Sequence, residues 1–168
     1  MYGRIFWLGV GDSIPTRKVD YCNLTSDGII GYADGNEIPY KTDRMRLFSV
    51  QTYNEMISNG IRIKNTKHPN FSREDAFPSW GDMGEHITID GMDFKKVRVG
   101  QVFALGKAAI KITGPSCVSE TVYDIFGKEL RRFLYEKRGN SGFCAEVIGE
   151  GKLTMSDAIE LIELVQPV

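Results

Sequence analysis

A cysteine in a glycine-proline loop is the residue of this chain best suited to chemistry. Residues 113–117, TGPSC, follow an apolar stretch that alternates like a β-strand and end at Cys117. A second loop, residues 137–142 (KRGNSG), lies about 20 residues further on and leads into another strand-like stretch. A thiolate is a soft ligand and a nucleophile, and an arginine beside glycines binds anions. Together, the two loops predict a sulfur ligand beside an anion site.

The chemistry of Cys117 depends on its ionisation, because the thiolate is the reactive and metal-binding form. Lys111, Lys137 and Arg138 supply positive charge near it in the sequence, and a helix is expected to start after Ser119. Both effects favour the thiolate. The alternative interpretation is that Cys117 is a small buried hydrophobic residue, which is the usual role of a lone cysteine.

The second loop carries three candidate binding residues. Arg138, with Asn140 and Ser141, is suited to a phosphate or a pterin pyrophosphate, because arginine forks onto phosphate oxygens and glycines let backbone N–H groups approach. The alternative is an ordinary hairpin turn. Arg44 and Arg46 alternate along an expected strand, so both project from one face and are candidates for the same cleft. Solvated or structurally paired arginines are the alternative.

Thr88 and His86 share one face of a short expected strand at residues 84–91. They are candidates for ligand contact, and His86 is alternatively a proton relay or a structural histidine. The histidines and cysteines do not have the spacing of a zinc site. The chain contains no Ser-His-Asp signature, no P-loop and no dinucleotide fingerprint.

The elements that must position these residues are short strands separated by glycine turns. The chain has 18 glycines among 168 residues. Residues 28–35 are expected to form a loop, residues 53–58 a helix ended by Asn59 and Gly60, and residues 122–135 a helix broken at Gly127. Residues 157–165 fit either a helix or a strand. The pattern predicts a mainly β (α+β) fold, a barrel or closed sheet with a few peripheral helices.

Charge and composition exclude several classes of protein. The 21 basic and 22 acidic residues give a net charge of -1, which argues against non-specific nucleic-acid binding. The apolar runs are too short to span a bilayer, and the first residues are not a secretory signal. Three irregularly spaced cysteines are typical of reduced thiols, so a cytoplasmic protein is expected. Residues 1–168 are interpreted as a single domain.

The order of these motifs resembles the MOSC domain, named for the C-terminal part of the molybdenum-cofactor sulfurase. The resemblance extends from about residue 4 to residue 164 and is carried by the order of seven short segments. These segments are residues 28–35, 43–49, 84–91, 99–102, 113–117, 138–143 and 156–161. The resemblance implies a MOSC-like closed β-barrel with a few peripheral helices.

The resemblance also implies a function. MOSC proteins are linked to molybdenum-cofactor metabolism, so Cys117 is implied to be a persulfide sulfur carrier or a molybdenum ligand. Molybdenum cofactor (molybdopterin) is then the ligand of Arg44, Arg46, Thr88, Arg138, Asn140 and Ser141, and the partner is a sulfur donor or a molybdoenzyme. Residues 31–35 lack the histidine and the basic residue common in relatives. That departure motivates an alternative, a non-catalytic ligand-binding or interaction domain on the same barrel.

Overall fold

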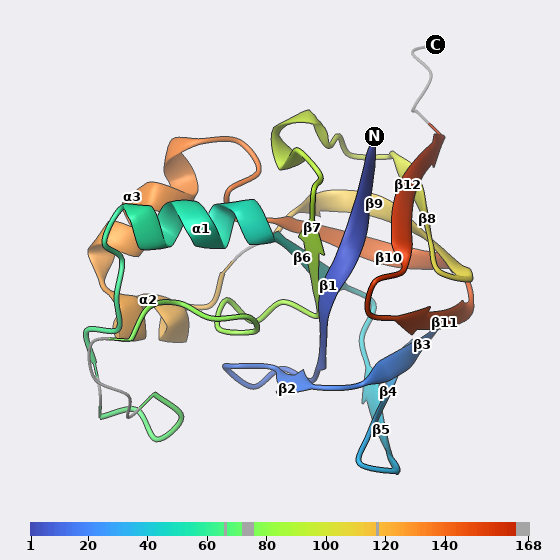
Figure 1. Ribbon diagram of the computed structural model, residues 1–168, viewed down its shortest axis with the longest axis horizontal. Helices are drawn as coiled ribbons and strands as arrows, with labels where there is room; N and C mark the ends of the chain where they lie inside the picture. The colour runs from blue at the N-terminus through green and yellow to red at the C-terminus, as the bar shows by residue number, and fades with distance from the viewer. Residues whose placement is uncertain (66, 72–75, 117, 164–168) are drawn as a thin grey trace.

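The strands of this chain close into a barrel with helices on one side (Figure 1). The computed structural model describes residues 1–65, 67–71, 76–116 and 118–163. Within them, the main sheet has the order β12-β8-β9-β10-β6-β7-β1-β2, and β1 also pairs with β12. That pairing closes a ring of seven strands, from which β2 (Arg17–Lys18) extends. The expectation of a mainly β, closed barrel is confirmed.

Neighbouring strands of the ring run antiparallel, except that β6 and β7 are parallel. A parallel pair needs a long crossover, and the segment containing the first helix supplies it here. The strands of the ring are β1 (Tyr2–Val10), β6 (Met45–Ser49), β7 (Ile87–Asp90), β8 (Val102–Leu105), β9 (Ala108–Pro115), β10 (Phe143–Gly149) and β12 (Ala158–Glu163).

A second, four-stranded sheet packs against one end of the barrel. Its order is β11-β3-β4-β5, with β3 (Tyr21–Thr25), β4 (Gly28–Ala33), β5 (Asn36–Lys41) and β11 (Gly151–Thr154). A tight turn at Asp34 and Gly35, with φ values of 53° and 75°, joins β4 to β5. β5 is the outer strand, and Pro39 lies within it opposite Ile30.

The expectation of a loop is therefore wrong for residues 28–33, which form β4, while residues 34–35 are a turn. Gly28 and Gly31 are required by close packing, whereas Gly35 is in the turn with nothing near its Cβ position. A Cβ at Gly31 would lie 2.6 Å from a methyl carbon of Val19 and 2.8 Å from one of Val10. Only glycine at position 31 lets β4 approach Val10 of β1 and Val19 so closely, so here glycine marks a buried strand.

Three helices form a layer outside the barrel within the described residues: α1 (Val50–Ser58), α2 (Glu120–Phe126) and α3 (Lys128–Glu136). α1 begins at Val50, three residues before the expected start, because the Ser49 hydroxyl caps it by accepting from the Gln51 amide at 3.1 Å. It ends at Asn59 and Gly60, as expected. Gly127, with φ of 91°, separates α2 from α3, which confirms the predicted break.

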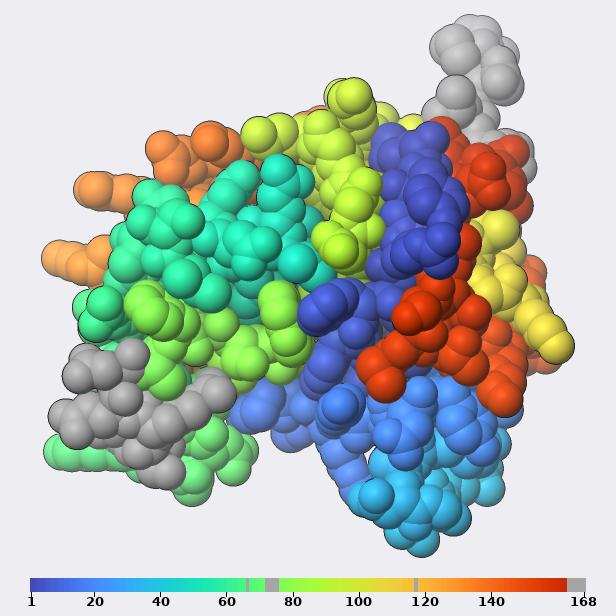
Figure 2. Space-filling view, in the orientation of Figure 1, coloured from blue at the N-terminus to red at the C-terminus, as the bar shows by residue number. Residues whose placement is uncertain are grey.

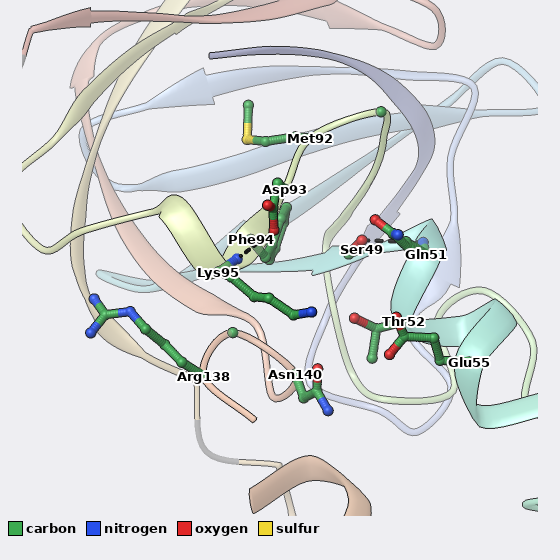
Figure 3. Close-up of a pocket in the computed structure, with 12 residues that line it drawn as sticks. Ser49, Gln51, Thr52, Glu55, Met92, Asp93, Phe94, Lys95, Arg138 and Asn140 are labelled. Carbon is green, nitrogen blue, oxygen red and sulfur yellow. Dashed lines mark hydrogen bonds between the residues drawn. The ribbon is translucent and has the colours of Figure 1, made fainter. Parts of the chain in front are cut away.

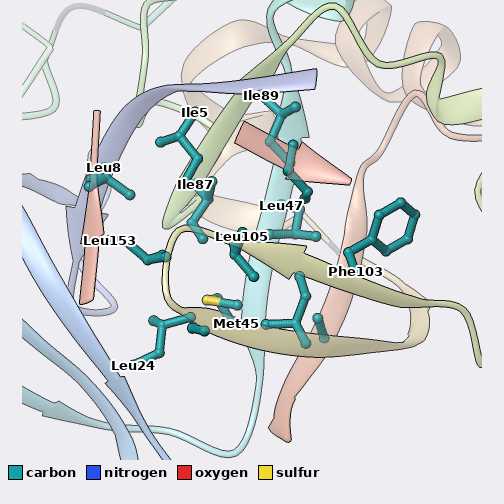
Figure 4. Packing of buried hydrophobic residues seen from close by; sticks show 14 of the residues in the cluster. Ile5, Leu8, Leu24, Met45, Leu47, Ile87, Ile89, Phe103, Leu105 and Leu153 are labelled. Atoms are coloured by element: carbon teal, nitrogen blue, oxygen red, sulfur yellow. The ribbon is translucent and has the colours of Figure 1, made fainter. Parts of the chain in front are cut away.

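Two hydrophobic clusters hold these layers together. One fills the barrel and extends under the small sheet, where Leu24 and Leu153 meet Met45 and Leu105 (Figure 4). The other lies between the barrel wall and the helices and includes Phe48, Met56 and Phe126. Strand residues alternate between the two sides of the wall, so a single strand such as β6 contributes to both clusters.

The ambiguous stretch at residues 157–165 is a strand where it is described. β12 pairs with β8 on one side and with β1 on the other. Ile159 is buried, whereas Ala158, Glu160 and Ile162 are exposed, which is the alternation of a half-buried strand. Tertiary pairing decides the conformation, because periodicity alone permitted either element.

Figure 2 shows β1 and β12 side by side at the surface, with β3 to β5 protruding at the lower edge and α1 at the upper left. Each described helix is too short to cross a membrane.

Candidate functional site

A polar cavity of about 310 Å³ opens between the start of α1, the segment after β7 and the second glycine loop (Figure 3). These three segments are far apart in sequence and meet where the helical layer joins the barrel. The lining residues are Ser49, Gln51, Thr52, Glu55, Gly91, Met92, Asp93, Phe94, Lys95, Arg138, Gly139 and Asn140. The cavity therefore gathers hydroxyl, amide and charged groups from three elements.

One wall comes from α1. Ser49 caps the helix, and Thr52 and Glu55 follow at intervals of three residues, which places all three on the same side of the helix. Ser49 and Thr52 are almost fully buried, while Glu55 is half-buried. The α1 wall therefore presents two hydroxyl groups and a carboxylate to the cavity.

The facing wall comes from the 3₁₀ helix η1 (Phe94–Lys96) and the second glycine loop. Asp93 caps η1, because its Oδ1 accepts from the Lys95 amide at 3.0 Å. A Cβ at Gly139 would lie 2.7 Å from the carbonyl oxygen of Phe94. Glycine at position 139 thus allows the loop to pack directly on η1, which brings Lys95 beside Asn140.

The structure brings two of the predicted binding residues, Arg138 and Asn140, to this cavity. Asn140 is buried, and its Nδ2 donates to the Phe133 carbonyl at 3.0 Å, so it fixes the loop to the end of α3. Arg138 is exposed, and its Nη2 donates to the Val97 carbonyl at 3.1 Å. Figure 3 shows its guanidinium directed away from Thr52 and Glu55. Ser141 is half-buried and does not line the cavity.

Cys117 lies outside the described residues, but its chain neighbour is fixed. The Ser116 amide donates to the Gly142 carbonyl at 3.0 Å, and Ser116 is buried. Pro115 pairs with Phe143 at the start of β10. The cysteine loop and the second glycine loop therefore run next to each other, as the sequence analysis expected of the two motifs.

Arg44, Arg46 and Thr88 do not line this cavity. Arg44 is exposed in the turn before β6, where its amide donates to the Thr42 hydroxyl at 3.1 Å. Arg46 is half-buried, and its Nε donates to the Gly84 carbonyl at 2.7 Å. Its guanidinium thus holds the segment before β7. Alternation placed Arg44 and Arg46 on one face, but Arg44 lies in the turn before β6.

His86 has the geometry of a neutral structural histidine. Its Nδ1 accepts from the Arg46 amide at 3.1 Å, and its Nε2 lies 2.9 Å from the Gly11 carbonyl, to which it donates. Burial, and to a smaller extent the positive charge of Arg46, lower the pKa of His86 to about 4. The imidazole therefore stays uncharged near neutral pH.

Thr88 belongs to a buried network that the sequence analysis missed. Its hydroxyl donates to Glu85 Oε2 at 2.9 Å, and the Tyr53 hydroxyl donates to Glu85 Oε1 at 2.9 Å. All three side chains are almost completely buried. Burial raises the pKa of Glu85 to about 7, although the hydrogen bonds from Tyr53 and Thr88 oppose the rise.

This network connects α1 to the segment before β7. The Met83 amide donates to the Tyr53 hydroxyl at 3.3 Å, and the Thr16 hydroxyl donates to the Glu85 carbonyl at 2.7 Å. Glu85 lies within residues 84–91, and its partner Thr88 is three residues further on, but nothing in the sequence marked the pair as buried. Tyr53 is 32 residues away in the chain, and only the fold brings it to Glu85.

The sequence also gave no reason to join Ser49, Thr52 and Lys95 into one site. The position of the capping Ser49 beside a cavity depends on the packing of η1 and the second glycine loop. In the part of the chain that the structure describes, no group of three or more His, Cys, Asp or Glu side chains could hold a metal ion.

The closed barrel with an outer helical layer is a MOSC-like fold. It is similar to the crystal structure of YiiM from Escherichia coli, with a TM-score of 0.64 and 20% sequence identity over 100% of this chain and 73% of that one. It is also similar to the YUAD protein from Bacillus subtilis, with a TM-score of 0.63 and 16% identity over 96% of both chains. At these identities the likeness is one of fold.

One curated protein matches in sequence, the uncharacterized protein YflK of Bacillus subtilis (strain 168). The identity is 27% over 79 residues, which is 47% of this chain and 36% of that protein. The match thus spans about a third of the relative's length. No family model matches this chain.

Proposed function

We propose that this protein binds molybdenum cofactor or a related pterin at the cavity, with Cys117 as a sulfur carrier or a molybdenum ligand. The supporting observation is the 3.0 Å hydrogen bond from the Ser116 amide to the Gly142 carbonyl. It holds the residue before Cys117 against the loop whose Gly139 and Asn140 line the cavity. The MOSC-like fold is consistent with this function.

The donor set of the cavity fits the anionic end of such a cofactor. Ser49, Thr52 and Asn140 supply buried polar groups, and Lys95 supplies a positive charge at the rim. Hydrogen bonds from neutral donors together with one cation are a common way to hold a phosphate. Asn140 and Lys95 would orient the ligand, while the chain on either side of residue 117 fixes where a thiolate can meet it.

When bound, the cofactor supplies the redox chemistry of molybdenum. As a sulfur carrier, the Cys117 thiolate attacks the terminal sulfur of a donor persulfide, forms a new S–S bond and releases the donor as a thiolate. This reaction needs no oxidant beyond the persulfide itself. A sulfur donor and a molybdoenzyme acceptor are the partners that this role requires.

The test is to produce the full chain anaerobically in a host that makes the cofactor, and to measure bound molybdenum and extracted pterin. We expect both in the wild type. Cys117→Ser should lose molybdenum or persulfide, and Lys95→Met should lose pterin by about tenfold, as expected for a lost charge-assisted hydrogen bond.

Arg44→Met is the matched control, because it removes an exposed arginine outside the cavity. It should bind pterin like the wild type. Absence of both pterin and molybdenum from folded wild-type protein would contradict the proposal, and so would equal loss of pterin in Lys95→Met and Arg44→Met.

A second candidate is a ligand-binding domain without catalysis. It is favoured by Arg46 and Thr88, two predicted site residues whose side chains are engaged within the protein. In that case Cys117→Ser leaves ligand binding unchanged, whereas Lys95→Met still weakens it.

A further inference from the structure

Three polar side chains that are at least nine-tenths buried converge on the cavity. Ser49 is 3% exposed, Asn140 is 4% exposed and Thr52 is 6% exposed. Buried polar groups cost free energy unless they have hydrogen-bond partners. Their convergence on one cavity is therefore informative about what the cavity holds.

These side chains keep donors to spare. Ser49 Oγ accepts from the Gln51 amide, so its own O–H is left to donate. Asn140 uses one amide hydrogen on the Phe133 carbonyl and retains the other. Among the described residues, no buried side-chain polar atom lacks a hydrogen-bond partner; the Thr52 hydroxyl has none, so its oxygen is open to the cavity. Figure 3 shows its oxygen on the side that faces the Lys95 ammonium.

Charged side chains of both signs line the cavity from facing walls. Lys95 and Glu55 line it from facing walls, yet within the described residues they form no ion pair with each other. Asp93 is already occupied, since it caps η1, and the Arg138 guanidinium is bonded to the Val97 carbonyl. Of the two lining carboxylates, Glu55 is the half-buried one, and its side chain has no hydrogen bond within the described residues.

An anion in this cavity meets several donors and also the carboxylates of Glu55 and Asp93. An ionised carboxylate only accepts hydrogen bonds, so Glu55 repels an anion whose oxygens are all unprotonated. A phosphate monoester, whose second pKa is about 6, carries an O–H in about half of its molecules at pH 6 and in about a tenth at pH 7. Sulfate carries none in this range, so it has nothing to donate to Glu55.

We propose that the cavity binds the phosphate group of a phosphate monoester in its singly protonated form, and that Glu55 selects this form over sulfate. Ser49, Thr52 and Asn140 donate to the phosphate oxygens, Lys95 supplies the balancing charge, and the phosphate O–H donates to Glu55. The proposal rests on the proposed function only for the natural ligand, because neither molybdenum nor Cys117 takes part.

Calorimetric titration of the full chain with inorganic phosphate and with sulfate tests the selection. Near pH 6 the wild type should bind phosphate about tenfold more tightly than sulfate, as expected for one hydrogen bond to a charged group. Glu55→Gln should bind sulfate more tightly than the wild type does and lose most of this preference. Glu129→Gln, an exposed residue of α3, is the matched control and should retain it.

Two further measurements separate this role from a structural one. Binding of methyl phosphate, a phosphate monoester, should weaken from pH 6 to pH 8 as its last proton is lost, whereas inorganic phosphate keeps an O–H over this range. The charged residues that line the cavity are Glu55, Asp93, Lys95 and Arg138, and no histidine is among its lining residues. Thr52→Val should weaken phosphate binding by about threefold to tenfold, and Thr52→Ser should restore it.

Equal binding of phosphate and sulfate by the wild type would overturn the proposal, and so would no binding of either by folded protein. An unchanged preference in Glu55→Gln would also overturn it. Phosphate selection without bound molybdenum or pterin would contradict the proposed function alone. Bound pterin without phosphate selection would contradict only this inference.

Discussion

At the scale of single residues, Glu85 and His86 are neighbours with opposite roles in the pH dependence of stability. Burial raises the pKa of Glu85 above its usual 4.5 to about 7 and lowers the pKa of His86 below its usual 6.5 to about 4. The stability contributed by Glu85 is present below pH 4.5 and is lost as pH rises through 7. The contribution of His86 is present above pH 6.5 and is lost as pH falls through 4. Between pH 4.5 and 6.5 the Glu85 contribution falls with rising pH while the His86 contribution rises, so the two pH dependences partly cancel.

Glu85→Gln should expose this balance. The amide cannot ionise, so only the His86 contribution remains. The free energy of unfolding of the variant, minus that of the wild type, should increase as pH rises from 4.5 to 7. Urea unfolding across this range measures the difference. The exposed Glu37→Gln is the control, and its difference should be flat. A flat difference for Glu85→Gln would show that its carboxyl titrates alike in both states.

At the scale of elements, the second glycine loop packs closely on neighbouring backbone at two of its residues, Gly139 and Gly142. Gly142 has a φ of 80°, and a Cβ there would lie 2.1 Å from the Leu47 carbonyl oxygen. Gly35 has a similar φ of 75° but has nothing within 4 Å of the position a Cβ would occupy. The two glycines therefore share a conformation and differ in their contacts.

Gly142→Ala should destabilise the protein more than Gly35→Ala. The left-handed conformation costs about 1–2 kcal/mol for alanine at either position. At Gly142 the clash with β6 adds to that cost, so we expect a total above about 3 kcal/mol. Thermal and urea unfolding of both variants measure the effect. Equal losses would mean that β10 can move away from β6 at no cost.

The success of sequence-based prediction differs between elements for physical reasons. The break at Gly127 and the helix end at Asn59 and Gly60 were predicted, because local backbone preferences determine them. β4 was missed, because the contacts that require glycine at position 31 are with Val10 and Val19, which are distant in sequence. Of the site, Arg138 and Asn140 were predicted from a local loop motif. Thr52, Glu55 and Lys95 were not, since only tertiary packing gathers them.

At the scale of the whole molecule, one core joins the small sheet to the barrel. Leu153 of β11 is fully buried in the barrel cluster, between strands of both sheets. β11 also leads directly from β10 of the barrel, so the two sheets are linked by chain and by packing. The small sheet should therefore unfold together with the barrel.

Leu153→Ala tests that link. A buried leucine replaced by alanine costs about 2–5 kcal/mol, and we expect one cooperative transition shifted to lower denaturant. Ile148→Ala, at a position 52% exposed, is the control and should cost much less. Fluorescence and circular dichroism should report the same midpoint. Two separate transitions would show that the sheets unfold independently.

The position of Pro39 in the outer strand β5 has a consequence for how this protein behaves at high concentration. A free strand edge is a template on which another chain can extend a sheet, and this leads to aggregation. Proline has no N–H to offer such a chain, so it interrupts the row of donors that a growing ladder needs. The barrel removes its own edges by closing, and the protruding sheet protects its β5 edge with one imino acid.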